Sequence, residues 1–249
     1  MTIDLRRRHV YALVLDVEGT TTPIAFVEEV LLPYARTHLR AGLEARRDHP
    51  QMLVALAELA AEHAADRNDA DPPPAWRAAT MADSLASVAE YAEWLMERDR
   101  KSPGLKRLQG LIWELGYEAG ELRGEVFDDV PDALVRCRSL GTEVAIYSSG
   151  SEMAQRRLFE SIESGDLTPF VNAYFDTSVG AKTDASSYTK IAAAMRQAPK
   201  EMLFISDVTP ELAAAKAAGM QVALSVRPGN RPQPDAGQFD TIASLKELV

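Results

Sequence analysis

Cysteine is almost absent from the sequence, since Cys137 is the single one among 249 residues. One thiol cannot form a disulfide within the chain, and such sparse use of cysteine is typical of proteins in reducing compartments. Cys137 stands at a spacing that suits the apolar face of a helix, which predicts a small buried side chain rather than a reactive thiol.

Long apolar runs are missing as well. No stretch approaches the roughly 20 apolar residues that a membrane helix needs, and no signal-peptide cleavage pattern follows the N-terminus. We therefore expect a soluble, cytoplasmic protein with no membrane partner.

Basic residues do not balance the acidic ones: 27 lysines and arginines against 37 aspartates and glutamates give a formal net charge of -10. Without a long basic run, a nucleic-acid partner is not expected. An acidic protein can still bind a phosphate, because local dipoles and one metal ion dominate a small site. We expect a monomer. The histidines have no metal-ligand spacing and are predicted to be surface or packing residues: His9, His38, His49 and His63.

Four short apolar runs predict buried strands of a parallel sheet, because charged or turn-forming residues bound them. These runs are residues 10–15, 143–147, 202–205 and 221–226. Helical patterns lie between them, at residues 132–140, 152–161, 187–195 and 210–218. The alternation predicts a doubly wound α/β sheet, in which ligands bind at the carboxyl ends of the strands.

The long connection after the first strand has a different composition, rich in Ala, Leu and Glu and without a strand-like run. Helical patterns cover residues 25–42, 51–67, 75–98 and 103–119. We interpret this region as an inserted helical cap domain at 25–124, with a catalytic core at 1–24 and 125–249. The alternative is that these helices merely cover one face of the sheet.

Two carboxylates follow the first predicted strand, Asp16 and Glu18. A carboxylate buried at a strand end is costly unless a metal ion or a polar site surrounds it. In an extended segment Asp16 and Glu18 point to the same side. One could then attack phosphorus while the other transfers a proton. A strand-end aspartate before an ordinary turn is the competing interpretation.

Three further polar groups stand at or near later strand ends. Ser148 and Ser149 precede a helix, where hydroxyls and free N–H groups suit a phosphate oxygen, although ordinary N-capping by Ser151 or a neighbour is the alternative. Lys182 could neutralise both a carboxylate and a phosphate, or be a solvated surface lysine. Asp207 could bind Mg²⁺ together with Asp16, or cap the helix that begins near residue 210. Taken together, the groups are the set needed for metal-assisted phosphoryl transfer.

The order Asp16, Ser148, Lys182, Asp207 resembles the four motifs of the haloacid-dehalogenase superfamily. That superfamily usually has Asp two residues after the nucleophile, whereas this chain has Glu18. In this respect it resembles the enolase-phosphatase (acireductone synthase) branch of methionine salvage, and the resemblance spans almost the whole chain. Further matching segments are residues 18–24, 26–27, 32–34, 108–113, 147–151, 175–177, 180–182, 187–188 and 226–230.

The resemblance implies a Rossmann-like core, a helical cap and one Mg²⁺ per chain. The implied reaction enolises and dephosphorylates 2,3-diketo-5-methylthiopentyl 1-phosphate to the acireductone. The implied metal ligands are the carboxylates of Asp16 and Asp207 and the backbone carbonyl of Glu18. The implied substrate contacts are Ser148, Ser149 and Lys182, and the catalytic residues are Asp16, Glu18 and Lys182.

Three questions stay open at this point. The base for enolisation is Glu18 or a residue of the cap. Residues 46–74 contain no segment that matches the family, so no cap contact to the methylthio end is assigned. The runner-up functions are a general small-metabolite phosphatase of the same superfamily and a silent relative that senses phosphorylated metabolites.

Overall fold

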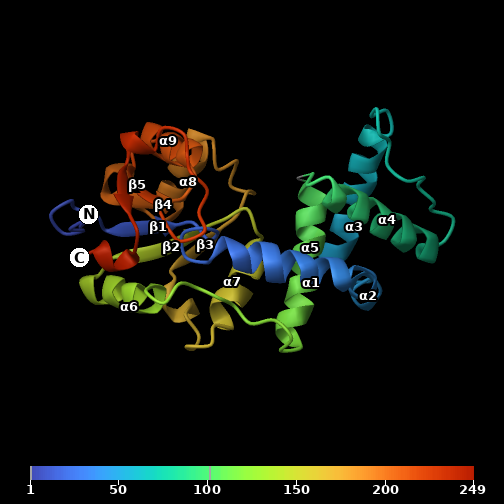
Figure 1. The fold of residues 1–249 in the computed structure, drawn as a ribbon, viewed down its shortest axis with the longest axis horizontal. Coiled ribbons are helices and arrows are strands. Elements are labelled where there is room, and N and C mark those ends of the chain that lie inside the picture. The colour runs from blue at the N-terminus through green and yellow to red at the C-terminus, as the bar shows by residue number, and fades with distance from the viewer. Residues whose placement is uncertain (1, 101) are drawn as a thin grey trace. The chain divides into compact units, whose positions relative to one another are not determined.

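The computed structural model describes residues 2–100 and 102–249 of the chain. The chain divides into two compact units (Figure 1). One unit is formed by the chain up to Glu28 together with Arg123–Val249, and the other is Glu29–Leu122.

The first unit is built on a parallel six-stranded sheet with the order β3-β2-β1-β4-β5-β6. Its strands are β1 (Ala12–Leu15), β2 (Glu143–Tyr147), β3 (Ala173–Phe175), β4 (Met202–Ser206), β5 (Gln221–Ser225) and β6 (Asp240–Ile242). This is the strand order of a doubly wound, dinucleotide-binding type of sheet. The predicted fold class is confirmed. The two short strands β3 and β6 were not predicted.

Helices cover both faces of the sheet, with α8 and α9 above it in Figure 1 and α6 and α7 below. Their bounds are α6 (Val130–Leu140), α7 (Glu152–Glu160), α8 (Ala185–Ala194) and α9 (Thr209–Ala217). Because both faces are covered, every residue of β1 and β4 is buried, which explains why these strands are continuous apolar runs. Cys137 on α6 is buried, as predicted, and burial raises the pKa of its thiol to about 11.

The regular secondary structure of the second unit is entirely helical in its described residues. It contains α1 (Leu32–Thr37), α2 (Leu39–Ala45), α3 (Pro50–Asp66), α4 (Met81–Glu97) and α5 (Pro103–Glu118), and a π-helical turn at Phe26–Leu31 precedes α1. The buried faces of these helices form one apolar core that includes Met52, Leu59, Tyr91, Leu95 and Leu108. The helical pattern predicted over residues 25–42 is confirmed, although the structure divides it into the π-helical turn and two short helices that meet at His38.

The predicted helix over 75–98 begins later than expected, at Met81. Ser87 explains the difference, because its hydroxyl accepts from the Arg77 N–H at 2.8 Å and donates to the Arg77 carbonyl at 3.0 Å. Both backbone groups of Arg77 are thereby satisfied outside a helix. Thr80 then caps α4 through a reciprocal pair of hydrogen bonds with Asp83, which starts the helix at the next residue.

None of the helices in the described ranges is long and apolar enough to cross a membrane. Within the same residues, no group of three or more His, Cys, Asp or Glu side chains is arranged to hold a metal ion. His63 is buried in the second unit between the rings of Trp76 and Tyr91, so this histidine is a packing residue.

A buried ion pair stabilises the first unit. Arg227 Nη1 lies 2.8 Å from Asp129 Oδ2, and both side chains are almost fully buried. Asp129 Oδ2 also accepts from Ser244 Oγ at 2.6 Å and from the Leu245 N–H at 2.5 Å. Burial alone would raise the pKa of Asp129, but the hydrogen bonds and charge of Arg227 and the hydrogen bond from Ser244 hold it below its ordinary value.

We predict that Asp129→Asn lowers the free energy of unfolding at pH 7 by about 3–5 kcal/mol, because it leaves the Arg227 guanidinium buried and unpaired. A carboxyl whose pKa is lower in the folded state contributes stability above its unfolded pKa and loses it as the pH falls through the folded pKa. The gap between wild type and variant should therefore narrow below about pH 4.

Urea unfolding between pH 3 and 7 measures this gap. The matched control is Asp132→Asn in the first turn of α6, the helix that Asp129 precedes. The Asp132 side chain is exposed, so a change within about 0.5 kcal/mol is expected. Equal losses in the two variants at pH 7 would show that the buried pair is not a main source of stability.

Candidate active site

Asp16 is the centre of a buried polar cluster at the carboxyl edge of the sheet. It follows the central strand β1 and is 4% exposed. Asp16 Oδ1 lies 2.6 Å from Lys182 Nζ and accepts from the Val17 N–H at 2.8 Å. Asp16 Oδ2 accepts from Ser206 Oγ at 2.9 Å. An ammonium ion and two hydrogen-bond donors thus contact the side chain of Asp16, whose carboxylate is a candidate nucleophile.

Lys182 lies in the loop that follows β3 and is buried rather than solvated. Besides Asp16, its ammonium contacts Glu211 Oε2 at 2.8 Å. Burial disfavours the charged ammonium, but the attraction of Asp16 and Glu211 outweighs burial and raises the pKa of Lys182. The Tyr188 hydroxyl donates to the Lys182 carbonyl at 2.6 Å and fixes the backbone of this loop. Lys182 therefore remains a cation beside Asp16.

Glu211 is a member of the cluster that was not predicted. It lies in the first turn of α9, and its Oε2 is 3.0 Å from Ser206 Oγ. Burial, and then the charge of Asp16, raise the pKa of Glu211 to about 7. The one available indication was its place four residues after Asp207, which puts it in the first turn of a helix at a strand end. Acidic residues are common at helix starts for capping reasons, so the pattern was not distinctive.

Asp207 follows β4, the strand next to β1, and is 7% exposed. It does not cap α9, because Val208 occupies the N-cap position. No hydrogen bond or ion pair of its carboxylate is found in residues 2–100 and 102–249. Burial, followed by the charge of Asp16, raises the pKa of Asp207 to about 7. A buried carboxylate of this kind is poised to accept a cation or a proton.

Glu18 belongs to the turn between Asp16 and the threonine run, and its side chain is exposed. The turn is closed by a bridge between Glu18 and Thr22 and by a 2.8 Å hydrogen bond from the Gly19 N–H to the Thr22 carbonyl. The charge of Glu18 contributes to the raised pKa of Asp207. Glu18 is therefore electrostatically part of the cluster, while its side chain is accessible to a ligand.

Ser148 and Ser149 lie at the same edge of the sheet, directly after β2. Leu15 pairs with Ile146, so Asp16 and the serines leave neighbouring strands at nearly the same level. No hydrogen bond of either serine side chain to Asp16, Lys182 or Asp207 occurs in the described chain. Ser151 accepts from the Ala154 N–H at 3.2 Å, so Ser151 caps α7, as the alternative interpretation predicted.

Asp16 and Asp207 together suit a hard divalent cation, which prefers carboxylate oxygens. Gly19 leaves room for this arrangement: a Cβ at Gly19 would lie only 2.5 Å from Asp207 Oδ2. The carboxylate of Asp207, without a partner of its own, fits the role of a metal ligand.

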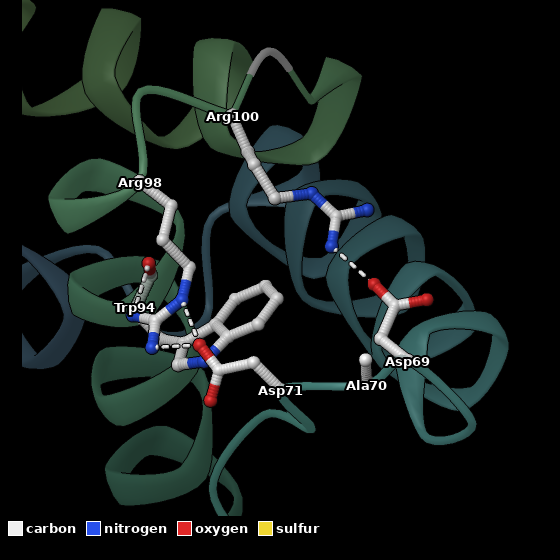
Figure 2. A pocket seen from close by; sticks show the side chains of 6 residues that line it. All are labelled: Asp69, Ala70, Asp71, Trp94, Arg98 and Arg100. Carbon is white, nitrogen blue, oxygen red and sulfur yellow. Dashed lines mark hydrogen bonds and ion pairs between the residues drawn. The ribbon is translucent and has the colours of Figure 1, made fainter.

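The second unit contains a hollow of about 360 Å³, with no part of the acidic cluster in its lining. Figure 2 shows Arg98 paired with Asp71 and Arg100 paired with Asp69. The two guanidinium groups lie 4.5 and 5.1 Å from the centre of the Trp94 ring. Within each pair the positive and the negative charge neutralise one another.

Comparison with known proteins agrees with this geometry. A family model of haloacid dehalogenase-like hydrolases matches residues 10–219. The chain is similar to "Enolase-phosphatase E1" of Synechococcus elongatus, with 46% identity over 236 residues that cover 95% of this chain and 96% of the relative. The chain belongs to the enolase-phosphatase branch of the haloacid dehalogenase-like hydrolases. The resemblance noted in the sequence is thereby confirmed.

The chain is also similar to a longer plant protein and to a yeast protein of known structure. A probable bifunctional methylthioribulose-1-phosphate dehydratase/enolase-phosphatase E1 of Populus trichocarpa is 42% identical over 240 residues, which are 95% of this chain but 46% of that protein. The crystal structure of the UTR4 protein from Saccharomyces cerevisiae has a TM-score of 0.71 and 31% identity, and the match covers 94% of this chain and 98% of that one.

We predict that Gly19→Ala disrupts the site beyond its effect on stability. Gly19 has φ +68°, and an added Cβ would displace the Asp207 carboxylate. Gly141→Ala is the matched control, because Gly141 has φ +73° and open space around the added atom. Both variants should lose roughly 1 kcal/mol from the left-handed backbone conformation.

Turnover of a chromogenic phosphate ester with Mg²⁺ separates the two variants. We expect Gly19→Ala to lose most of its activity and Gly141→Ala to retain wild-type activity when assayed well below its Tm. Equal activity of the two variants would mean that the close approach of Asp207 to Gly19 is not needed for function.

Proposed function

We propose that the protein is a magnesium-dependent enolase-phosphatase that converts 2,3-diketo-5-methylthiopentyl 1-phosphate to the acireductone and inorganic phosphate. The observation that carries the proposal is the buried contact between Asp16 and Lys182 with Asp207 beside it. The names of the relatives support the choice of substrate.

Dephosphorylation starts with Asp16. Its carboxylate oxygen forms a bond to phosphorus while the bond from phosphorus to the substrate oxygen breaks, and Glu18 gives the leaving oxygen a proton. Water then attacks phosphorus and loses a proton to Glu18, and the bond to Asp16 breaks to release phosphate. Lys182, held as a cation, offsets the negative charge that gathers at Asp16 and the phosphate.

The phosphate group is proposed to bind Ser148 and Ser149 at the N-terminus of α7. Gln155 fixes the loop that contains these serines, because its Nε2 donates to the Gly150 and Phe175 carbonyls at 2.7 and 2.9 Å. A Mg²⁺ ion bound by Asp16, Asp207 and the Glu18 carbonyl would supply further positive charge to the phosphate.

Enolisation precedes dephosphorylation in this proposal and needs a base that reaches a substrate carbon. Glu18 is the base that the first unit offers, because its side chain is exposed while those of Asp16 and Asp207 are buried. We also propose that the unit Glu29–Leu122 is the substrate cap, and that the enzyme is a cytoplasmic monomer.

A phosphatase for another small phosphate ester would use the same cluster. The two functions differ in one product: enolase-phosphatase releases phosphate together with an ultraviolet-absorbing enediol, whereas a plain phosphatase leaves the diketone unenolised. A sensor without catalysis would need no nucleophile beside a buried lysine.

We predict that Asp16→Asn abolishes phosphate release, by at least about a thousandfold, because an amide is a poor nucleophile and the group acts in a catalytic unit. If this variant still binds Mg²⁺, it should exchange substrate protons with deuterated water, since enolisation does not need the nucleophile. Phosphate assay and mass spectrometry of the recovered substrate measure the two steps.

Asp184→Asn is the control, because Asp184 caps α8 and has no part in the cluster, and asparagine caps helices equally well. This variant should keep both steps. Substantial phosphate release by Asp16→Asn, free of wild-type enzyme, would rule out the covalent mechanism, and loss of both steps in the control would show that the assay reports folding.

A further inference from the structure

The side chain of Asn230 is hydrogen-bonded to the turn at Gly19, which follows Asp16 and Glu18. It lies in the loop after β5, and its Nδ2 donates to the Gly19 carbonyl at 2.9 Å and to the Ser225 carbonyl at 3.1 Å. Both N–H bonds of the amide are therefore used. The orientation of the amide, and with it the direction of its oxygen, is fixed by these two contacts.

The amide oxygen of Asn230 is buried and has no hydrogen-bond partner. A buried acceptor without a donor costs about 1–3 kcal/mol, so its position calls for an explanation. A Cβ added to Gly19 would lie 3.0 Å from this oxygen and 2.5 Å from Asp207 Oδ2. The two oxygens thus flank the same small space above the Gly19 Cα atom.

Two acceptors that face one space repel each other unless a cation or a donor lies between or beside them. Asp207 is one of the proposed Mg²⁺ ligands, and Mg²⁺ keeps several waters that need acceptors. The two cations nearest this turn are already engaged: Lys182 by Asp16 and Glu211, and Arg227 by Asp129 and the Thr20 carbonyl. The Asn230 oxygen is therefore suited to the surroundings of the divalent cation.

We propose that Asn230 is a positioning residue of the cation site, with a buried amide oxygen that serves as an outer acceptor beside Asp207. This inference rests on the proposed function, because it concerns the cation of that site. It assigns Asn230 two tasks: the amide nitrogen positions the Gly19 turn, and the amide oxygen stabilises the bound cation.

Ser225 allows the two tasks to be separated. Its hydroxyl donates to the same Gly19 carbonyl at 3.0 Å, so Ser225→Ala removes one anchor of the turn and leaves the Asn230 oxygen in place. Asn230→Ala removes both the anchor and the oxygen. Asn230→Asp keeps an oxygen acceptor but, like alanine, cannot donate to Gly19.

Mg²⁺ binding measured by calorimetry on the full chain without substrate tests the proposal. We expect Asn230→Ala to weaken Mg²⁺ binding about tenfold or more, the usual effect of losing an outer partner of a metal site. Ser225→Ala should bind Mg²⁺ nearly as tightly as wild type, and Asn230→Asp at least as tightly. Metal-free thermal unfolding checks that each variant is folded.

Equal weakening in Asn230→Ala and Ser225→Ala, or in Asn230→Ala and Asn230→Asp, would overturn the role of the oxygen and reduce Asn230 to an anchor. Wild-type affinity in Asn230→Ala would overturn it as well, and would leave the proposed enzyme intact. Absence of Mg²⁺ binding by the wild type would contradict the metal role itself and this inference with it.

Discussion

The contact between the Lys182 ammonium and the Asp16 carboxylate is the interaction on which the site depends. Three carboxylates lie around this ammonium ion: those of Asp16 and Asp207, which are buried, and that of Glu211, which is 12% exposed. Leaving a buried charge without its partner costs about 3–5 kcal/mol, so removal of the lysine would destabilise this edge of the sheet. The excess of acid over base attracts a divalent cation, and the charge of a bound cation would in turn attract a phosphate.

The sheet brings these groups together because β1 and β4 are neighbours and all strands end at one edge. Carboxyl groups of two kinds, with lowered and with raised pKa values, change the stability of this unit in opposite directions as the pH changes. The Asp129 pair, whose carboxyl pKa is lowered, is lost at acid pH. The pKa values of Glu211 and Asp207 are each raised to about 7, so the stability they contribute is full below their unfolded pKa values and is lost as the pH rises through 7. The metal-free protein therefore loses stability at both low and high pH. A cation bound to these carboxylates would reduce the loss at high pH.

Strong local patterns made much of this molecule predictable. The four longer strands and the helices of the first unit follow from apolar runs and periodicity, and Asp16, Lys182 and Asp207 do meet, as their order suggested. The three-residue strands β3 and β6 were not predicted, because so short a segment has no sequence pattern of its own and is fixed by pairing with a neighbouring strand. The roles of Glu211 and Asn230 were not predicted for a different reason. They arise from contacts with Lys182 and Gly19, which lie 29 and 211 positions away in the sequence, and no local pattern indicates such contacts.

Acid-quenched single turnover of the wild-type enzyme tests the central claim most directly. Protein mixed with the diketo phosphate and Mg²⁺ is stopped in acid, digested and analysed by mass spectrometry for a phosphorylated peptide. The account predicts one transient phosphoryl group on the peptide that contains Asp16, formed before phosphate is released. Phosphate release with no phosphorylated protein at any time, or with the group on a peptide that lacks Asp16, would contradict it.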